Sequence, residues 1–382
     1  MKLVRRGRLS FLRSLFGKAQ VPPAPPRFLF LTVNQRCNLR CRHCAYWKQD
    51  DSDRARYLTR EQRRAIIREF AAMSPGAAVV ICGGESMLDP EAFFDVAATS
   101  RHAGLRCLAV VNGTCIRNED MANRMIREGP TEISISLNSH IESIHDETRG
   151  VPGAFRMATQ AVRLVRAARE QQGAATRLYV MALVHEGNYC ELDGFYDFVL
   201  RDLRADKLKL NFIQPTFGGS DPDEFFEQHH IRDARALLAV IRACDVKYGL
   251  NLSAAWMAQV QMYVESVSRN RDAIRGWHSE TGTVEHICNS YERNIMVDLY
   301  GQARLCFSTA FPGRTVRKPG ELRRFWFERS AAIRTQMRCC NRYCGISHSV
   351  RRENATSRPD APACGAAGDA HTATHRAARD AS

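Results

Sequence analysis

Six apolar runs of strand length alternate with helical patterns between residues 28 and 213, and this alternation restricts the fold of the 382-residue chain more than any other feature. Runs of this kind are typical of buried strands, and the helical intervals between them carry apolar residues at helical spacing. The first helix is expected to begin at a capping box formed by Thr59 and Gln62. The six runs are Phe28 to Val33, Ala78 to Cys82, Leu105 to Val111, Glu132 to Leu137, Leu178 to Val184 and Leu208 to Ile213.

Strands that alternate with helices pair in parallel, so we predict an α/β fold in the form of a partial (β/α)6 TIM-like barrel. The loops after such strands converge on one mouth, where functional residues are expected. We expect a basic flexible leader at 1–26, the barrel at 27–235, connecting helices and a small Cys-rich C-terminal domain at 236–345, and a tail at 346–382. The tail is predicted to be disordered because no Val, Ile, Leu, Phe, Met, Trp or Tyr follows Glu353.

Charge and cysteine content indicate the compartment. The formal net charge is +14, and residues 1–26 hold six basic residues and no acidic one. The leader fits a short basic amphipathic helix that contacts a membrane surface, although a frayed segment is the favoured interpretation. No run approaches the roughly 20 apolar residues of a membrane span, and the leader lacks a signal-peptide core, so we expect a cytoplasmic protein. Disulfides are rare there, and closely spaced cysteines therefore indicate a metal site.

Cys37, Cys41 and Cys44 place three thiols within eight residues, directly after the first predicted strand. Three thiolates suit three irons of a cubane cluster, which leaves the fourth iron open to an external chelator. A zinc knuckle is the alternative, but it needs a fourth ligand nearby. His43 is available, yet its place between Cys41 and Cys44 makes tetrahedral closure awkward.

The Cys-x3-Cys-x2-Cys spacing after a first strand resembles the radical S-adenosylmethionine (SAM) superfamily. The resemblance implies a 4Fe-4S cluster whose open iron chelates the amino and carboxylate groups of SAM. It also implies reductive cleavage of SAM to methionine and a 5'-deoxyadenosyl radical. His43 stands where this family usually has an aromatic side chain beside the adenine, and an imidazole can stack there too.

Further motifs follow the next strands and are similar to those of the same family. Gly83-Gly84-Glu85 resembles its GGE motif, which implies that Glu85 and the adjacent backbone hold the SAM amino group; Ser86 stands where the family often has Pro. Arg149 and Ser136 are candidates for the SAM ribose or carboxylate, although Arg149 could instead cap a helix or pair with Asp146. Asn138 replaces a common Asp. The predicted cofactor-binding residues are His43, Gly83, Gly84, Glu85, Asn112, Ser136, Asn138 and Arg149.

A second group of cysteines lies between 288 and 344, around a predicted hairpin formed by 295–299 and 303–305. It resembles the auxiliary-cluster domains called SPASM and twitch, which implies one further 4Fe-4S cluster. Its predicted ligands are Cys288, Cys306, Cys344 and either Cys339 or Cys340, with Cys340 preferred. A structural zinc site at Cys288, Cys306, Cys340 and Cys344 is the alternative. Small core residues are expected at Cys82, Cys107, Cys115, Cys190 and Cys244.

These features favour a radical SAM enzyme that abstracts hydrogen from a peptide or small-molecule substrate, leading to oxidation or crosslinking. A flavodoxin- or ferredoxin-type protein is the expected reductant. The main alternative is a nonenzymatic iron-sulfur or zinc protein that binds nucleic acid through its basic surface. Arginines on helical patterns, at 60–68 and 163–169, are more often solvated faces, so no nucleic-acid partner is expected. Radical SAM methyl or group transfer, with a purely structural second Cys region, is a third hypothesis.

Overall fold

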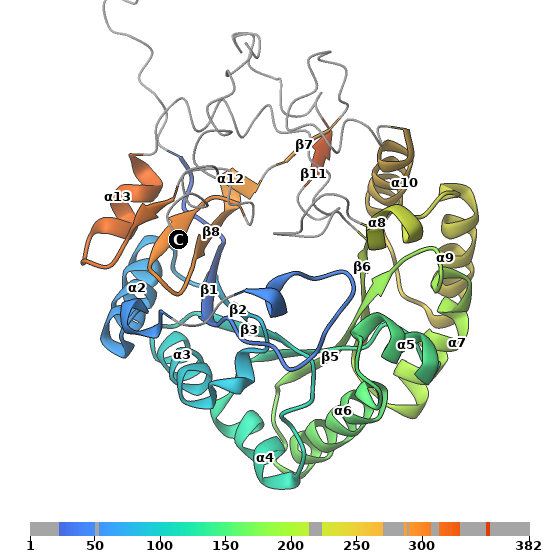
Figure 1. The fold of residues 1–382 in the computed structure, drawn as a ribbon, viewed down its shortest axis with the longest axis horizontal. Coiled ribbons are helices and arrows are strands. Elements are labelled where there is room, and N and C mark those ends of the chain that lie inside the picture. Colours follow the sequence, from blue (N-terminus) through green and yellow to red (C-terminus); the bar gives the residue numbers. More distant parts are fainter. Residues whose placement is uncertain are drawn as a thin grey trace, which may run out of the picture.

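The computed structural model describes residues 23–49, 53–213, 224–269, 286–288, 290–306, 313–328 and 349–351. In these residues the main element is a nine-stranded sheet of order β10-β9-β8-β1-β2-β3-β4-β5-β6. Neighbours from β1 to β6 all pair in parallel. Figure 1 shows the sheet curved into an open arc, with helices along its outer side. The predicted parallel sheet and partial barrel are confirmed.

The six strands lie within one or two residues of their predicted places. The strands are β1 (Phe28–Asn34), β2 (Ala78–Gly83), β3 (Arg106–Val111), β4 (Glu132–Ser136), β5 (Arg177–Val184) and β6 (Lys207–Phe212). The helices between them are α2 (Arg60–Met73), α3 (Pro90–His102), α4 (Glu119–Glu128), α5 (Glu142–Arg149), α6 (Ala154–Gln171) and α7 (Leu192–Asp197). The predicted capping box of α2 is present, with both reciprocal hydrogen bonds between Thr59 and Gln62.

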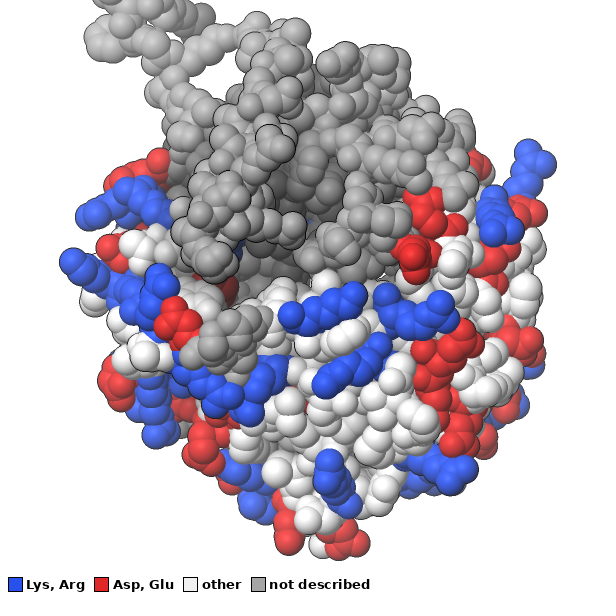
Figure 2. Space-filling view, viewed as in Figure 1, with Lys and Arg blue, Asp and Glu red and all other residues white. Residues whose placement is uncertain are grey.

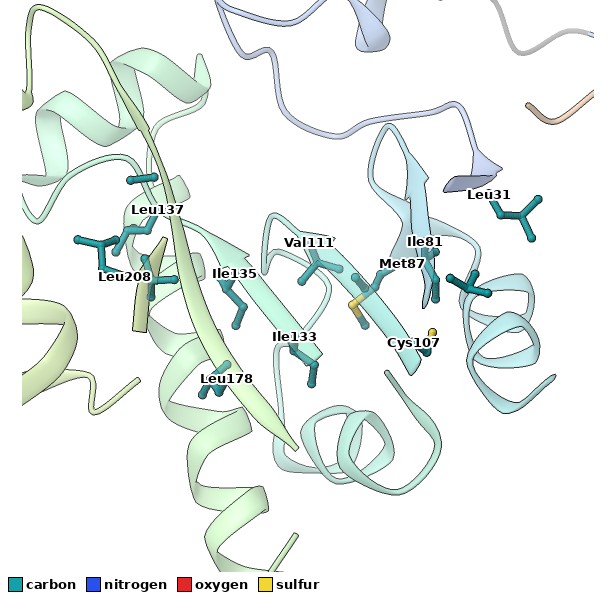
Figure 3. Close-up of a cluster of buried hydrophobic side chains, with 14 of the residues drawn as sticks. Leu31, Ile81, Met87, Cys107, Val111, Ile133, Ile135, Leu137, Leu178 and Leu208 are labelled. Atoms are coloured by element: carbon teal, nitrogen blue, oxygen red, sulfur yellow. The ribbon is translucent and has the colours of Figure 1, made fainter. Parts of the chain in front are cut away.

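The main core lies between the outer face of the sheet and these helices. Every second side chain of a strand points outward, as the pleat requires, and Ile133 and Ile135 of β4 are fully buried there. Figure 3 shows such side chains from successive strands in one continuous layer, together with Met87. This layer fixes the spacing of the strands, and hence the positions of the loops that follow them.

The predicted hairpin is present as β8 (Asn294–Val297) and β9 (Gln302–Arg304), which pair antiparallel. It continues the main sheet, because β8 pairs in parallel with β1, and β10 (Arg314–Thr315) adds to β9. The short helices α12 (Ser290–Arg293) and α13 (Glu321–Phe327) flank this edge. A separate pair joins β7 (His286–Cys288) to β11 (Ser349–Arg351), and β11 lies within 346–382, the range predicted to be a disordered tail.

Three helices follow β6: α8 (Glu224–His229), α9 (Ala234–Tyr248) and α10 (Ala254–Arg269). Among the helices of the described residues, none combines the length and apolar character needed to cross a membrane. Two of the expected core cysteines, Cys107 and Cys244, are buried. Cys190 is exposed, so its prediction as a core residue is wrong; it lies in a surface turn before α7.

Candidate functional site

The loop that carries the first three cysteines lies at the carboxyl end of β1 and packs on the end of α5. Its backbone is tied there by two hydrogen bonds, from Arg40 N to Arg149 O at 3.0 Å and from Arg42 N to Thr148 O at 3.1 Å. Gly150 ends α5 in a left-handed conformation, and a Cβ at this position would lie 2.3 Å from Arg40 O. Glycine therefore permits the close approach that holds the cysteine loop.

Cys37, Cys41 and Cys44 share one small apolar cluster with Leu39 and Ala154. Burial raises the pKa of Cys37 to about 11, and it also raises that of Cys44. Iron must therefore displace thiol protons when it binds. In the described part of the chain no three His, Cys, Asp or Glu side chains converge as ligands of a single ion. Three thiolates that each bind a different iron need not converge in this way.

Glu85 is buried in the middle of this edge of the sheet. Its carboxylate accepts from Met87 N at 3.0 Å and from Asn112 N at 2.7 Å, so it joins the ends of β2 and β3. Burial raises its pKa to about 7, although the two backbone donors oppose this effect. Each carboxylate oxygen keeps acceptor capacity, and no salt bridge to Glu85 is present among the described residues. A buried carboxylate that has spare acceptor capacity and no salt bridge suits a cationic ligand group, because a nearby cation favours the ionised form.

Gly83 and Gly84 lie directly against the backbone that leads from β1 into the cysteine loop. A Cβ on Gly83 would lie 1.9 Å from Asn34 O, and one on Gly84 would lie 2.3 Å from Arg36 O. Gly84 N donates to Asn34 O at 3.0 Å, and Glu85 N donates to Arg36 O at 2.8 Å. In this structure, the two glycines set the distance between the GGE segment and the cysteine loop.

Asn112 positions the cysteine loop through Asn38, which our sequence reasoning did not select. Asn112 Nδ2 donates to Asn38 Oδ1 at 2.9 Å, and Asn38 Nδ2 donates to Thr114 Oγ1 at 2.7 Å. The sequence does hold a signal for this contact. Asn38 directly follows Cys37 in the loop after β1. The end of β3 is only one strand beyond the neighbouring β2, which is close enough for the Asn38 side chain to reach.

Arg149 and Asn138 form a buried polar junction beside Cys41. Arg149 Nη1 lies 3.7 Å from Cys41 Sγ, and Nη2 donates to Asn138 Oδ1 at 3.1 Å. Asp146 instead accepts from two backbone amides at the start of α6, including Gly153 N at 2.6 Å. Asn138 also uses its amide on Thr148, whereas Ser136 is only half-buried on the inner face of the sheet. Arg149 Nε has no hydrogen-bond partner among the described residues.

Two rings from the far end of the sheet, His185 and Phe225, form a small cluster with His43 of the cysteine loop. The rings of His43 and His185 each lie 5.8 Å from that of Phe225, on α8. His185 Nδ1 accepts from Gly187 N at 3.1 Å, so the proton of the neutral ring is on Nε2. Burial lowers the pKa of His185 to about 4. Neither His43 Nδ1 nor His185 Nε2 has a described partner, and the sequence offered no sign that Phe225 would join them.

The predicted second cluster is described only in small part. Cys306 is buried just after β9, and Cys288 ends β7. Cys339, Cys340 and Cys344 lie outside the described residues. The auxiliary ligands therefore stay a prediction. The first site, in contrast, fits a cubane cluster with a charged chelating ligand, because it offers three thiols, a guanidinium with a free Nε and a buried carboxylate without a salt-bridge partner.

Comparison with known proteins gives similarities over the part of the chain that contains the cysteine loop. The sequence profile of the radical SAM superfamily matches residues 31–199. An AdoMet-dependent heme synthase of Methanosarcina barkeri (strain Fusaro / DSM 804) is 27% identical over 199 residues, which are 52% of this chain and 54% of that protein. The antilisterial bacteriocin subtilosin biosynthesis protein AlbA of Bacillus subtilis (strain 168) is 25% identical over 60% of this chain and 51% of its own length. The chain thus spans about half the length of these curated relatives.

Among solved structures, Streptococcus suis SuiB is similar with a TM-score of 0.57. The similarity covers 80% of this chain and 66% of SuiB, at 12% identity. At that identity the likeness concerns the fold alone. It agrees with the curved parallel sheet and its outer helices.

Proposed function

We propose, since residues 31–199 belong to the radical SAM superfamily, that this chain cleaves SAM reductively and abstracts hydrogen from a substrate held at the mouth of the barrel. The superfamily implies a 4Fe-4S cluster and SAM as cofactors. Once reduced and bound, the cluster would supply the electron that divides SAM into methionine and a 5'-deoxyadenosyl radical. The observation that supports the proposal most is the position of Cys37, Cys41 and Cys44 beside Glu85 and Arg149 on one edge of the sheet.

The residues of the chain have separable roles in this proposal. The three thiolates hold the cluster, while Arg149, 3.7 Å from Cys41 Sγ, offsets their negative charge and offers its free Nε to the SAM carboxylate. Glu85 accepts from the SAM amino group, since an ammonium favours the ionised form of a buried carboxylate. His43 and Phe225 exclude water on the side where the adenine is expected.

The substrate is a peptide or a small molecule, and the reaction an oxidation or a crosslink. The relatives include both a heme synthase and a bacteriocin biosynthesis protein, which supports each class equally. A flavodoxin- or ferredoxin-type protein is the proposed reductant. A second cluster on Cys288, Cys306, Cys340 and Cys344 is part of the same proposal, and unchanged iron content in Cys288→Ala would refute that part.

The nucleic-acid-binding alternative is less well supported by the charges. Arginines on the helices pair with acids, as in Arg166 with Glu170 at 2.8 Å and Arg169 with Asp206 at 2.6 Å. Figure 2 shows acidic side chains interspersed with basic ones over much of the described face. Paired arginines are less available to phosphates than an unopposed basic stripe would be.

The test is SAM cleavage by the anaerobically reconstituted protein. The wild type, treated with iron, sulfide, dithionite and SAM, is expected to form 5'-deoxyadenosine. A variant with Cys37→Ala, Cys41→Ala and Cys44→Ala is expected to form none, while Cys190→Ala, which changes an exposed cysteine, retains the activity. A fully reconstituted wild type that leaves SAM intact would overturn the proposal and favour the binding protein.

A further inference from the structure

The inner face of the sheet, turned away from the helices, carries apolar side chains that the described residues do not bury completely. The strand register places Phe30, Val80 and Leu108 side by side on this face, and all three are only partly buried. Val110, two residues beyond Leu108, is 39% exposed. Parallel sheets are normally covered on both faces. Apolar side chains that remain partly accessible in the middle of such a sheet therefore suit contact with a bound molecule.

A single lysine extends across this face from the opposite side of the arc. Lys209, on β6, lies over the ring of Tyr179 with Nζ 3.8 Å from the ring centroid, and Nζ is 3.4 Å from Ser134 Oγ. Its side chain is 28% exposed. The ammonium is thus held in one place by groups of β4 and β5, while part of the side chain stays accessible.

Among the described residues, the ammonium of Lys209 has one carboxylate partner, in a long ion pair: Glu132 Oε2 lies 3.9 Å from Nζ. The other oxygen of Glu132 pairs with Arg106 at 3.2 Å, so Glu132 is shared between two cations. The remaining charged groups that act on Lys209 are the cations Lys207 and Arg177. Burial lowers the pKa of Lys209, Glu132 opposes this effect, and the two like charges add to it. A half-buried cation beside other cations is stabilised by an anion that a ligand supplies.

The geometry points to a substrate with an apolar body and a carboxylate, in which the body lies on Val80, Leu108 and Val110 and the carboxylate pairs with Lys209. This inference rests on the proposed function, because it names the substrate class of that same site. Lys209 lies three residues before the end of β6, which is about 10 Å from the edge that carries the cysteine loop. A molecule about 10 Å long therefore reaches from Lys209 to the reacting end of the site.

A carboxylate fits this position better than a phosphate. Glu132 belongs to the same charge network, so it repels a dianion more strongly than a monoanion. Among the described residues, the only hydrogen-bonding group held against the ammonium is the hydroxyl of Ser134, whereas phosphate sites in proteins usually combine several backbone amides or arginines.

The test compares two fluorescent probes, 1-pyrenebutyrate and 1-pyrenebutanol, which share their apolar body and differ in the carboxylate. We expect the reconstituted full-length wild type to bind pyrenebutyrate at least tenfold more tightly. Lys209→Met should reduce this ratio to less than threefold without changing the affinity for pyrenebutanol, and Lys209→Arg should restore most of it. Lys247→Met, which changes a surface lysine paired with Asp193, serves as the matched control and should leave the ratio unchanged.

Equal binding of both probes by the wild type, or no measurable binding of pyrenebutyrate, would overturn the inference. So would loss of both probes in Lys209→Met with an unchanged melting temperature. Formation of 5'-deoxyadenosine from SAM without substrate is measured in the same samples. Intact SAM cleavage with equal probe binding refutes only the carboxylate site, whereas discrimination between the probes without SAM cleavage refutes only the proposed function.

Discussion

Replacing Gly84 by alanine tests whether the close backbone contact between the GGE segment and the cysteine loop is needed for iron binding. The added Cβ would lie 2.3 Å from Arg36 O and 2.7 Å from Gln35 O, both backbone atoms. Ordinary contact begins at 3.4 Å, so the backbone one residue before Cys37 has to move by about 1.1 Å (3.4 − 2.3). Overpacking of this kind typically costs about 1–3 kcal/mol. We expect Gly84→Ala to stay folded but to retain less than half of the wild-type iron after reconstitution and desalting.

Gly173→Ala is the control, because it should lower the stability of the protein without displacing the cysteine loop. Gly173 has φ of +57°, and a Cβ there would meet nothing within 4 Å, so the change strains only the local backbone by about 1–2 kcal/mol. The two variants should therefore have similar free energies of unfolding, measured in urea, but different iron contents. Full iron retention in Gly84→Ala, or an equal loss of iron in Gly173→Ala, would refute the reasoning.

Three further predictions concern the loop anchor, a histidine and a buried carboxylate. Asn38→Ala removes two hydrogen bonds to the end of β3, and we expect faster loss of iron to a chelator than in wild type, with a melting temperature lowered by only a few degrees. The pKa of His185 is lowered to about 4, so the unfolded chain takes up its proton first as the pH falls. About 3 kcal/mol of stability should accordingly be present above pH 6.5 and lost as the pH falls to 4. In His185→Gln, the free energy of unfolding in urea should depend correspondingly less on pH between these two values. An unchanged pH dependence in this variant would contradict the prediction. Asp95 is buried and accepts from Arg60 Nε at 2.8 Å and Arg64 Nε at 2.9 Å. Asp95→Ala should destabilise the protein by about 2 kcal/mol in urea unfolding without changing the iron content per folded chain, and a loss below 0.5 kcal/mol would show that the pair contributes little.

The alternation of apolar runs was sufficient to predict the barrel. In β4, for example, the burial of Ile133 and Ile135 on the helix side follows directly from their spacing of two residues. The hairpin of β8 and β9 was also predicted, because Tyr300-Gly301 stands between two apolar runs as a tight turn. In the structure, Gly301 has the positive φ that suits such a turn. That β8 pairs with β1 and continues the main sheet was not predicted. Pairing between strands more than 250 residues apart leaves no local signal in a single sequence.

For the candidate site, the sequence by itself determined the chemistry: three thiols in one loop, two glycines followed by a carboxylate, and polar residues after successive strands. Their spacing along the chain constrains which groups are available, and parallel strands bring their following loops to one edge. Only the tertiary structure decided which groups act on one another. The contact of Arg149 with Cys41, the approach of Phe225 to His43 and His185, and the partly accessible inner face beneath Lys209 all join elements far apart in sequence. Such contacts depend on how helices and strands pack, and that packing is a property of the whole core rather than of any one segment.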